Sequence, residues 1–166
     1  MASGEICAIL GPPMQVNDDS ATLDFVTTGS TPASNISVLD FDTGSDEYAE
    51  FQGVWQNYAS GGITVKFVAS FGAITSGTGM IAGDLQIIES TDTPSASYSF
   101  VYTSQSDTQT APGTATRHIA YEFDIADETG MTDGGYFILR LVRDVSGDTA
   151  AGDLELWVAS LHIVEQ

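Results

Sequence analysis

The sequence is poor in cations. Only four of its 166 residues are Lys or Arg, against 23 Asp and Glu, which gives a formal net charge of −19. Proteins bind nucleic acids through Lys and Arg that displace counterions from phosphates, and anionic membrane surfaces attract the same residues. Four cations spread along the chain (Lys66, Arg117, Arg140 and Arg143) cannot form such a basic patch. We therefore expect neither a nucleic acid nor a membrane as partner.

Cysteine and long apolar runs are also scarce. A single cysteine, Cys7, excludes an intrachain disulfide and a thiolate metal cluster. The apolar run Ile6–Leu10 is too short for the core of a signal peptide and follows an acidic residue. No stretch approaches the roughly 20 apolar residues of a membrane-spanning helix. The expected product is a soluble protein made in the cytoplasm.

Catalytic patterns are missing as well. The two histidines, His118 and His162, lie far apart in the sequence, and no Gly-x-Ser-x-Gly motif is present. His118 falls on the polar face of a predicted strand and is interpreted as a solvated side chain. Carboxylates cluster in several loops, so calcium ligands or the acid pair of a glycosidase stay open, but none has the spacing of a calcium loop. We predict no catalytic residue, no metal, no cofactor and no enzymatic activity.

The sequence is rich in residues that form strands and turns. It contains 18 threonines, 17 serines and 17 glycines, and apolar side chains alternate with polar ones in several short segments. This period of two is typical of strands with one buried face. Strands are predicted at 22–27, 36–41, 48–55, 63–71, 84–90, 96–102, 117–125, 136–142 and 154–164. This pattern predicts an all-β sandwich or barrel.

The chain divides into two parts of different composition. Residues 1–35 show little periodicity and are predicted to form an extended N-terminal arm, followed by a β-domain over 36–166. The polar segment 103–116 is predicted to be an exposed, mobile loop.

The last two predicted strands are apolar on both faces, so each needs a second covering surface, which a loop, the arm or a neighbouring subunit could supply. If a subunit or a capsid surface covers them, the contact residues include Trp157, Leu161, Ile163, Ile6, Ile9 and Leu10. A central strand covered by a loop of the same chain is an equally good interpretation.

Two arginines on one predicted strand indicate an ion pair that maintains the fold. Arg140 and Arg143 are an odd number of positions apart and therefore point to opposite faces. Arg143 lies at the end of the strand, beside Asp144 and within reach of Asp148, where an arginine–carboxylate pair would hold the turn. Arg140 is flanked by apolar residues and must be paired if it is buried.

The C-terminal third carries a family resemblance. The pattern Arg-x-x-Arg-Asp at 140–144, Asp148-Thr149, Gly152-Asp153 and the following apolar residues, with Tyr58 and Gly61-Gly62 upstream, resembles small structural proteins encoded beside the tail or capsid genes of tailed bacteriophages. The resemblance covers roughly residues 46–164.

The resemblance implies a jelly-roll-like antiparallel β-sandwich with an extended N-terminal arm. It implies a capsid decoration (cement) protein that bridges capsomers on the virion surface, is a homotrimer and has the major capsid protein as its partner. The alternative is a receptor- or glycan-binding module of a tail fibre.

Overall fold

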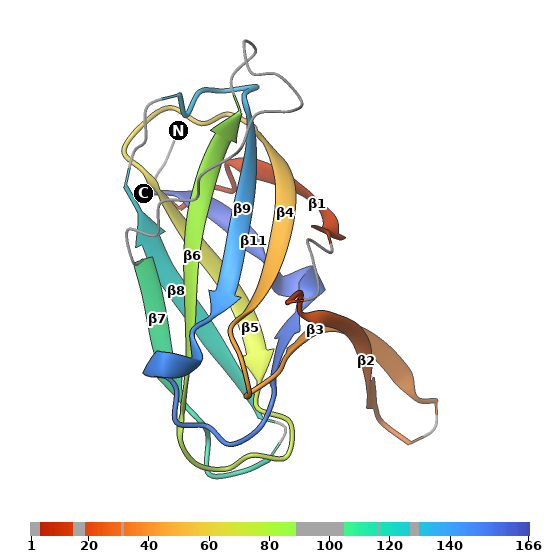
Figure 1. Ribbon diagram of the computed structural model, residues 1–166. Coiled ribbons are helices and arrows are strands. Elements are labelled where there is room, and N and C mark those ends of the chain that lie inside the picture. The colour runs from red at the N-terminus through yellow and green to blue at the C-terminus, as the bar shows by residue number, and fades with distance from the viewer. Residues whose placement is uncertain (1–3, 15–18, 31, 89–104, 116, 127–129) are drawn as a thin grey trace.

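The fold is an antiparallel β-sandwich of two sheets packed face to face (Figure 1). The computed structural model describes residues 4–14, 19–30, 32–88, 105–115, 117–126 and 130–166. The strand predicted at 96–102 lies outside these ranges.

The front sheet in Figure 1 has the strand order β1-β4-β9-β6-β7. Its strands are β1 (Ala8–Met14), β4 (Glu47–Trp55), β9 (Tyr136–Arg143), β6 (Thr78–Ile88) and β7 (Gln105–Thr110). The back sheet consists of β8 (His118–Ile125), β5 (Ile63–Ser70), β10 (Leu154–Trp157), β11 (His162–Glu165), β3 (Ser34–Phe41) and β2 (Thr22–Thr28). In the back sheet, β8 pairs with one edge of β5. Strands β11 and β10 both pair with the other edge, β11 near the start of β5 and β10 near its end. Strands β3 and β2 lie beyond β10.

The strand order confirms a jelly-roll-like sandwich. Strands β3, β10, β5 and β8 lie in one sheet and β4, β9, β6 and β7 in the other, and apart from the β6–β7 pair each successive strand from β3 to β10 changes sheet. This is the interleaved order of a jelly roll. The chain reaches it because apolar alternation gives most of its strands one face that must be buried against the opposite sheet.

The core lies between the two sheets and is rich in aromatic rings. Its largest fully buried side chains are Trp55, Arg143, Tyr121, Phe41, Phe51, Phe67, Phe71 and Phe137, joined by aliphatic residues of both sheets. Glycines make room for rings, since a methyl group at Gly53 would overlap the ring of Phe137 and one at Gly83 would overlap Phe123. Replacing Gly53 would displace the ring of Phe137 on the neighbouring strand, and replacing Gly83 would force apart the two sheets, because Phe123 lies on β8 of the back sheet.

The N-terminal segment belongs to the sheets. Strand β1 pairs with β4 at the edge of the front sheet, and its ladder shifts register between Leu10 and Pro13, where two prolines are tolerated because the strand is at an edge. Strand β2 pairs with β3 over its whole length. The predicted boundary at residue 35 therefore falls inside β3, and the β2–β3 hairpin projects beyond the sandwich in Figure 1.

Two further expectations are corrected. The polar segment predicted to be a loop contains β7, which pairs with β6 from Gln105 to Thr110. The single strand predicted over 154–164 is instead split into β10, the 3-10 turn η2 (Val158–Ser160) and β11. The Ser160 hydroxyl bridges this break, accepting a hydrogen bond from the Val68 amide at 2.8 Å and donating to the Trp157 carbonyl at 2.6 Å.

Candidate functional site

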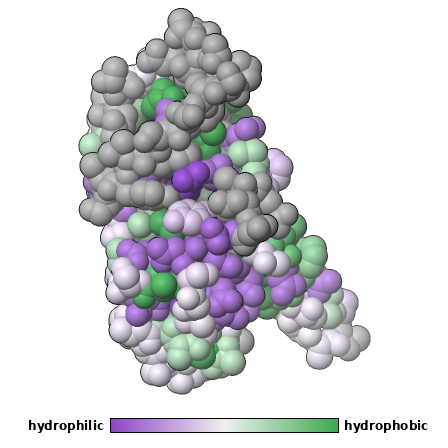
Figure 2. Space-filling view, viewed as in Figure 1, coloured by the Kyte–Doolittle hydropathy of each residue, from purple (hydrophilic) through white to green (hydrophobic). Residues whose placement is uncertain are grey.

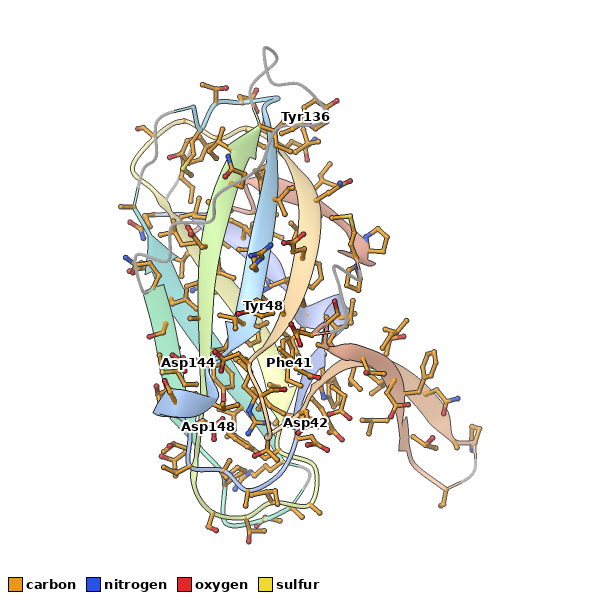
Figure 3. All side chains as sticks on the ribbon, viewed as in Figure 1. Phe41, Asp42, Tyr48, Tyr136, Asp144 and Asp148 are labelled. Carbon is orange, nitrogen blue, oxygen red and sulfur yellow. The ribbon has the colours of Figure 1, made fainter. Side chains whose placement is uncertain are left out.

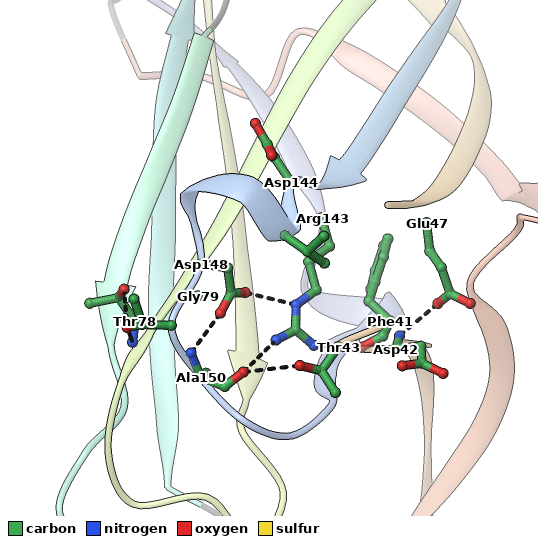
Figure 4. Close-up of polar contacts among 12 residues, drawn as sticks. Phe41, Asp42, Thr43, Glu47, Thr78, Gly79, Arg143, Asp144, Asp148 and Ala150 are labelled. Atoms are coloured by element: carbon green, nitrogen blue, oxygen red, sulfur yellow. Dashed lines mark hydrogen bonds and ion pairs between the residues drawn. The ribbon is translucent and has the colours of Figure 1, made fainter. Parts of the chain in front are cut away.

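Arg143 organises the end of the molecule where β9 leaves the front sheet. Its side chain is completely buried, and its Nε–H donates to Asp148 Oδ2 at 2.8 Å (Figure 4). The Nη1 group donates to the Phe41 carbonyl at 2.8 Å and Nη2 to the Ala150 carbonyl at 3.4 Å. A buried charge with this many partners ties β9, β3 and the loop before β10 together.

Neighbouring acids cap the same turn. Asp144 Oδ1 accepts hydrogen bonds from the amide and the hydroxyl of Ser146 at the start of η1 (Val145–Gly147). Asp148 Oδ1 accepts the Ala150 amide at 2.7 Å. Figure 3 shows Asp144 and Asp148 at the opposite end of the sandwich from Tyr136. Arg143 thus pairs with Asp148, while Asp144 caps the turn.

Arg140 points to the opposite face of β9, as its spacing from Arg143 requires. Its Nε–H donates to Glu50 Oε1 at 2.6 Å, a second hydrogen bond runs from Nη2 to the same oxygen, and its guanidinium carbon lies 5.5 Å from the centre of the Tyr48 ring. Glu50 is buried on β4. The acid that pairs with Arg140 therefore comes from a neighbouring strand and not from the turn.

The residues proposed for an interface are dispersed. Ile163 is completely buried in the core and does not reach the surface. Ile6 and Ile9 are exposed, at 62% and 57%. Leu10 and Leu161 line one groove of about 320 Å³ between β1 and η2. Trp157 lies apart from all of these, on the outer face of the back sheet.

A cavity of about 530 Å³ opens beside Tyr136, whose side chain is 62% exposed (Figure 3). Some of its other polar groups are engaged in the turn that precedes β9. Asp133 accepts the Asn57 amide, and the Gly134 amide donates to the Trp55 carbonyl. These hydrogen bonds hold the turn, and the Tyr136 ring stands beside the cavity.

Figure 2 shows hydrophilic side chains over the middle of the described part of the front face and hydrophobic ones at the base of the projecting hairpin. A groove of about 300 Å³ lies at that base, between the end of β1 and β2. The described part of the front face is thus largely polar at its centre.

The outer face of the back sheet carries a row of polar residues that crosses five strands. Register places Thr22, Asp40, Glu155, Ser70 and His118 directly opposite one another in successive strands. Strands are about 4.8 Å apart, so the row is roughly 19 Å long. These residues come from positions 22 to 155 of the chain and meet only because of the jelly-roll order.

Trp157 makes one end of this row into a cleft. It follows Glu155 by two positions on β10 and so shares its face. The cleft has a volume of about 360 Å³ and is lined by Val26, Thr27, Gly29, Ser70, His118, Glu155 and Trp157.

The side chains of the cleft hold one another in place. The Ser70 hydroxyl donates to Glu155 Oε2 at 2.6 Å and accepts from the Trp157 indole N–H at 3.4 Å. The His118 ring stands edge-to-face against Trp157, with 3.9 Å between the ring centres. The aromatic ring and the carboxylate are therefore fixed before a ligand arrives.

Polar capacity remains in the cleft. Glu155 Oε1 and the imidazole nitrogens of His118 accept or donate no hydrogen bond within the described ranges. A fixed indole beside a carboxylate oxygen and an imidazole is the kind of surface that takes the apolar face of a ring while bonding its polar substituents.

The field around the cleft is negative. Burial, together with the nearby carboxylates of Asp153, Glu155, Asp24 and Glu47, raises the pKa of Asp40 from 3.8 to about 6. One oxygen of Asp40, Oδ1, is buried without a hydrogen-bond partner in the part of the chain that the structure describes.

The described ranges contain no metal-binding cluster, and their one cysteine is not activated. They hold no group of three or more His, Cys, Asp or Glu placed to bind a metal ion, and no helix long and apolar enough to cross a membrane. Burial, with a smaller contribution from Glu165, raises the pKa of the Cys7 thiol to about 11, which makes it a poor nucleophile.

Comparison with known proteins leaves the family open. No protein-family model and no curated protein matches the chain. Among solved structures, it resembles the CBM22 tandem domain from Paenibacillus barcinonensis Xyn10C, with 17% identity and a TM-score of 0.46 over 90% of this chain and 45% of the other. It also resembles the mannan-recognising carbohydrate-binding module TmCBM27, with 8% identity and a TM-score of 0.38 over 96% and 98% of the two chains.

The enzymatically active domain of bacteriophage CBA120 tailspike protein 4 matches with 12% identity and a TM-score of 0.42, over 94% of this chain and 19% of that one. This chain therefore spans less than half of the CBM22 tandem domain and of the tailspike domain. All three TM-scores are below 0.5, so a function has to be argued from the residues of the site.

Proposed function

We propose that the protein is a non-catalytic glycan-binding module and that the Trp157 cleft is its binding site. The observation that carries this proposal is the fixed constellation of Trp157, Ser70 and Glu155 beside a cavity of about 360 Å³. An indole ring stacks on the C–H face of a sugar, and carboxylate and imidazole groups bond its hydroxyls.

The cleft is favoured over the cavity at Tyr136 because its polar groups converge on an aromatic ring. Near Tyr136, the Asp133 carboxylate accepts the Asn57 amide, and the described ranges show no hydrogen bond that fixes the Tyr136 ring. In the Trp157 cleft the bonds among the side chains fix the ring while Glu155 Oε1 and His118 keep bonding capacity. Sites that fix their groups in advance lose less entropy on binding.

The test is a screen of neutral, cationic and anionic oligosaccharides with the intact chain, followed by titration of each ligand found. Trp157→Ala is expected to abolish measurable binding, whereas Tyr136→Ala, a matched loss of an aromatic ring in the other cavity, is expected to leave it unchanged. Loss of binding in Tyr136→Ala alone, or no binding to any glycan, would show the proposal to be wrong.

A second function, capsid decoration, is supported by apolar side chains that the sandwich leaves exposed. Ile6, Ile9, Leu23 and Phe25 are each more than half exposed, and Leu23 and Phe25 lie on the projecting β2–β3 hairpin (Figure 1). Surfaces of this kind are candidates for contacts between proteins. A decoration protein would use them as a homotrimer bound to the major capsid protein on the virion surface.

Mass spectrometry of purified particles tests this second function. Hundreds of copies, in a simple ratio to the shell protein, would support decoration. A handful would support the glycan-binding module of a tail fibre, and complete absence would exclude both virion roles.

A further inference from the structure

The sign of the charges around the Trp157 cleft restricts the class of glycan. We propose that its ligand is an amino sugar with a protonated amine, such as an oligomer of glucosamine, and that N-acetylated, neutral and uronic-acid glycans bind less well. This inference rests on the proposed glycan-binding function and goes beyond it by naming the substrate class.

Carboxylates dominate one side of the cleft. Glu155 lines it directly, Asp40 is the next residue in the polar row, and Asp24 lies close enough to Asp40 to raise its pKa. Each of these groups repels a uronate or sialic-acid carboxylate and attracts an ammonium group.

Three of the four Lys and Arg residues of the chain are held in ion pairs outside the cleft. Arg143 is buried in the core, paired with Asp148, and Arg140 is paired with Glu50 on the other sheet. Lys66 pairs with Glu122 at 3.1 Å. Arg117 is exposed just before β8 and is not among the residues that line the cleft. Three of the four cations are therefore engaged in ion pairs away from the carboxylates of the row.

The aromatic ring favours the same ligand. A cation over the face of an indole is attracted by the negative charge density of the ring, and Trp binds cations better than Tyr or Phe does. In this cleft the indole and the Glu155 carboxylate are joined through Ser70. An ammonium substituent on a stacked sugar can therefore contact both a ring face and a carboxylate oxygen. An acetamide substituent carries no charge and gains neither electrostatic attraction.

The experiment compares oligomers of equal length made of glucosamine, N-acetylglucosamine and galacturonate, titrated into the wild-type chain at low salt and pH 7, above the pKa of about 6 of Asp40. The glucosamine oligomer is expected to bind at least about tenfold more tightly than its N-acetylated counterpart. The galacturonate oligomer is expected to bind most weakly.

Two variants separate the cleft from the general attraction of an acidic protein for cations. Glu155→Gln removes one charge in the cleft. Glu5→Gln removes one charge near the other end of β5. There the Glu5 backbone carbonyl accepts a hydrogen bond from the Glu165 amide, and Glu165 is paired with Ile63 in the sheet. That end is roughly 23 Å from Ser70 along the strand. The preference for the amine should fall severalfold in Glu155→Gln, because Asp40 and Asp24 remain, and should persist unchanged in Glu5→Gln.

Equal binding of the amine and N-acetylated oligomers would overturn the inference and leave the glycan-binding function in place. An equal effect of the two Glu→Gln variants would also overturn it, because the attraction would then belong to the whole surface. Failure of all three oligomers and of every other glycan in the screen would overturn the proposed function itself.

Discussion

The Arg143 cluster and the Trp157 cleft both join strands that are far apart in sequence, but they use their polar groups differently. At Arg143 the guanidinium bonds to Asp148 and to two carbonyls, and Asp148 in turn accepts an amide. In the cleft, Glu155 keeps one oxygen outside such bonds, and a cavity adjoins it. A polar cluster whose hydrogen-bonding groups are all paired within the protein stabilises the fold. A cluster that keeps unpaired hydrogen-bonding groups beside a cavity is suited to bind a ligand.

The largest effect is expected from breaking the first cluster. Arg143→Ala leaves Asp148 and the Phe41 carbonyl buried without their charged partner, so it should lower the free energy of unfolding by about 3–5 kcal/mol. Denaturant unfolding measures this loss. Lys66→Ala, which removes an exposed ion pair, is the control and should cost no more than about 1 kcal/mol. Equal losses would show that burial of Arg143 adds nothing.

A smaller effect is expected at the other arginine of β9. Arg140→Met keeps an apolar stem but leaves the buried Glu50 carboxylate without its partner. Because Arg140 is itself partly exposed, water can reach this position, and we expect a loss of about 1–3 kcal/mol. The same unfolding experiment applies, and a cost above that of Arg143→Ala would reverse the ranking of the two sites.

Ser70→Ala tests how the open site is held together. It removes the hydroxyl that joins Trp157 to Glu155, while Glu155 is only partly buried and remains solvated. The expected cost in unfolding free energy is about 1 kcal/mol, but glycan affinity should fall severalfold because the ring and the carboxylate lose their fixed arrangement. Unchanged affinity in a folded variant would argue against this role of Ser70.

The sequence allowed the fold class and the two arginines to be predicted. Alternation with a period of two identified most strands, and the odd spacing of Arg140 and Arg143 placed them on opposite faces. Both features depend on local geometry, which adjacent residues determine. The identity of Arg140's partner was not predictable, because Glu50 lies 90 positions away and meets Arg140 only through strand register.

The cleft could not be found from local patterns for the same reason. Ser70, His118 and Glu155 belong to three different strands, and His118 was interpreted as a solvated side chain because alternation reports only its face. Strand β7 was missed because Gln105–Thr110 contains no apolar residue, and its pairing with β6 makes it a strand. The sequence did contain one indication of the cleft. Trp157 follows Glu155 by two positions, a spacing that places an aromatic ring and a carboxylate on the same face of a strand.

The smallest predicted effect concerns the negative electrostatic potential around the Trp157 cleft. Folding raises the pKa of Asp40 from 3.8 to about 6, chiefly through burial and then through Asp153 and Glu155. The folded protein therefore binds this proton more tightly than the unfolded chain does. The resulting stabilisation is fully present below about pH 4 and is lost as the pH rises through 6.

Asp40→Asn removes this titration. At pH 7.5 the variant should be more stable than the wild type, by up to about 1 kcal/mol because solvent screens a carboxylate that is only partly buried. Near pH 4 the two proteins should have equal stability, and high salt should shrink the difference at pH 7.5. Thermal unfolding from pH 4 to 8 measures the difference. A constant offset across this range would mean that the substitution acts through packing, and the negative field at the Trp157 cleft would then need another source.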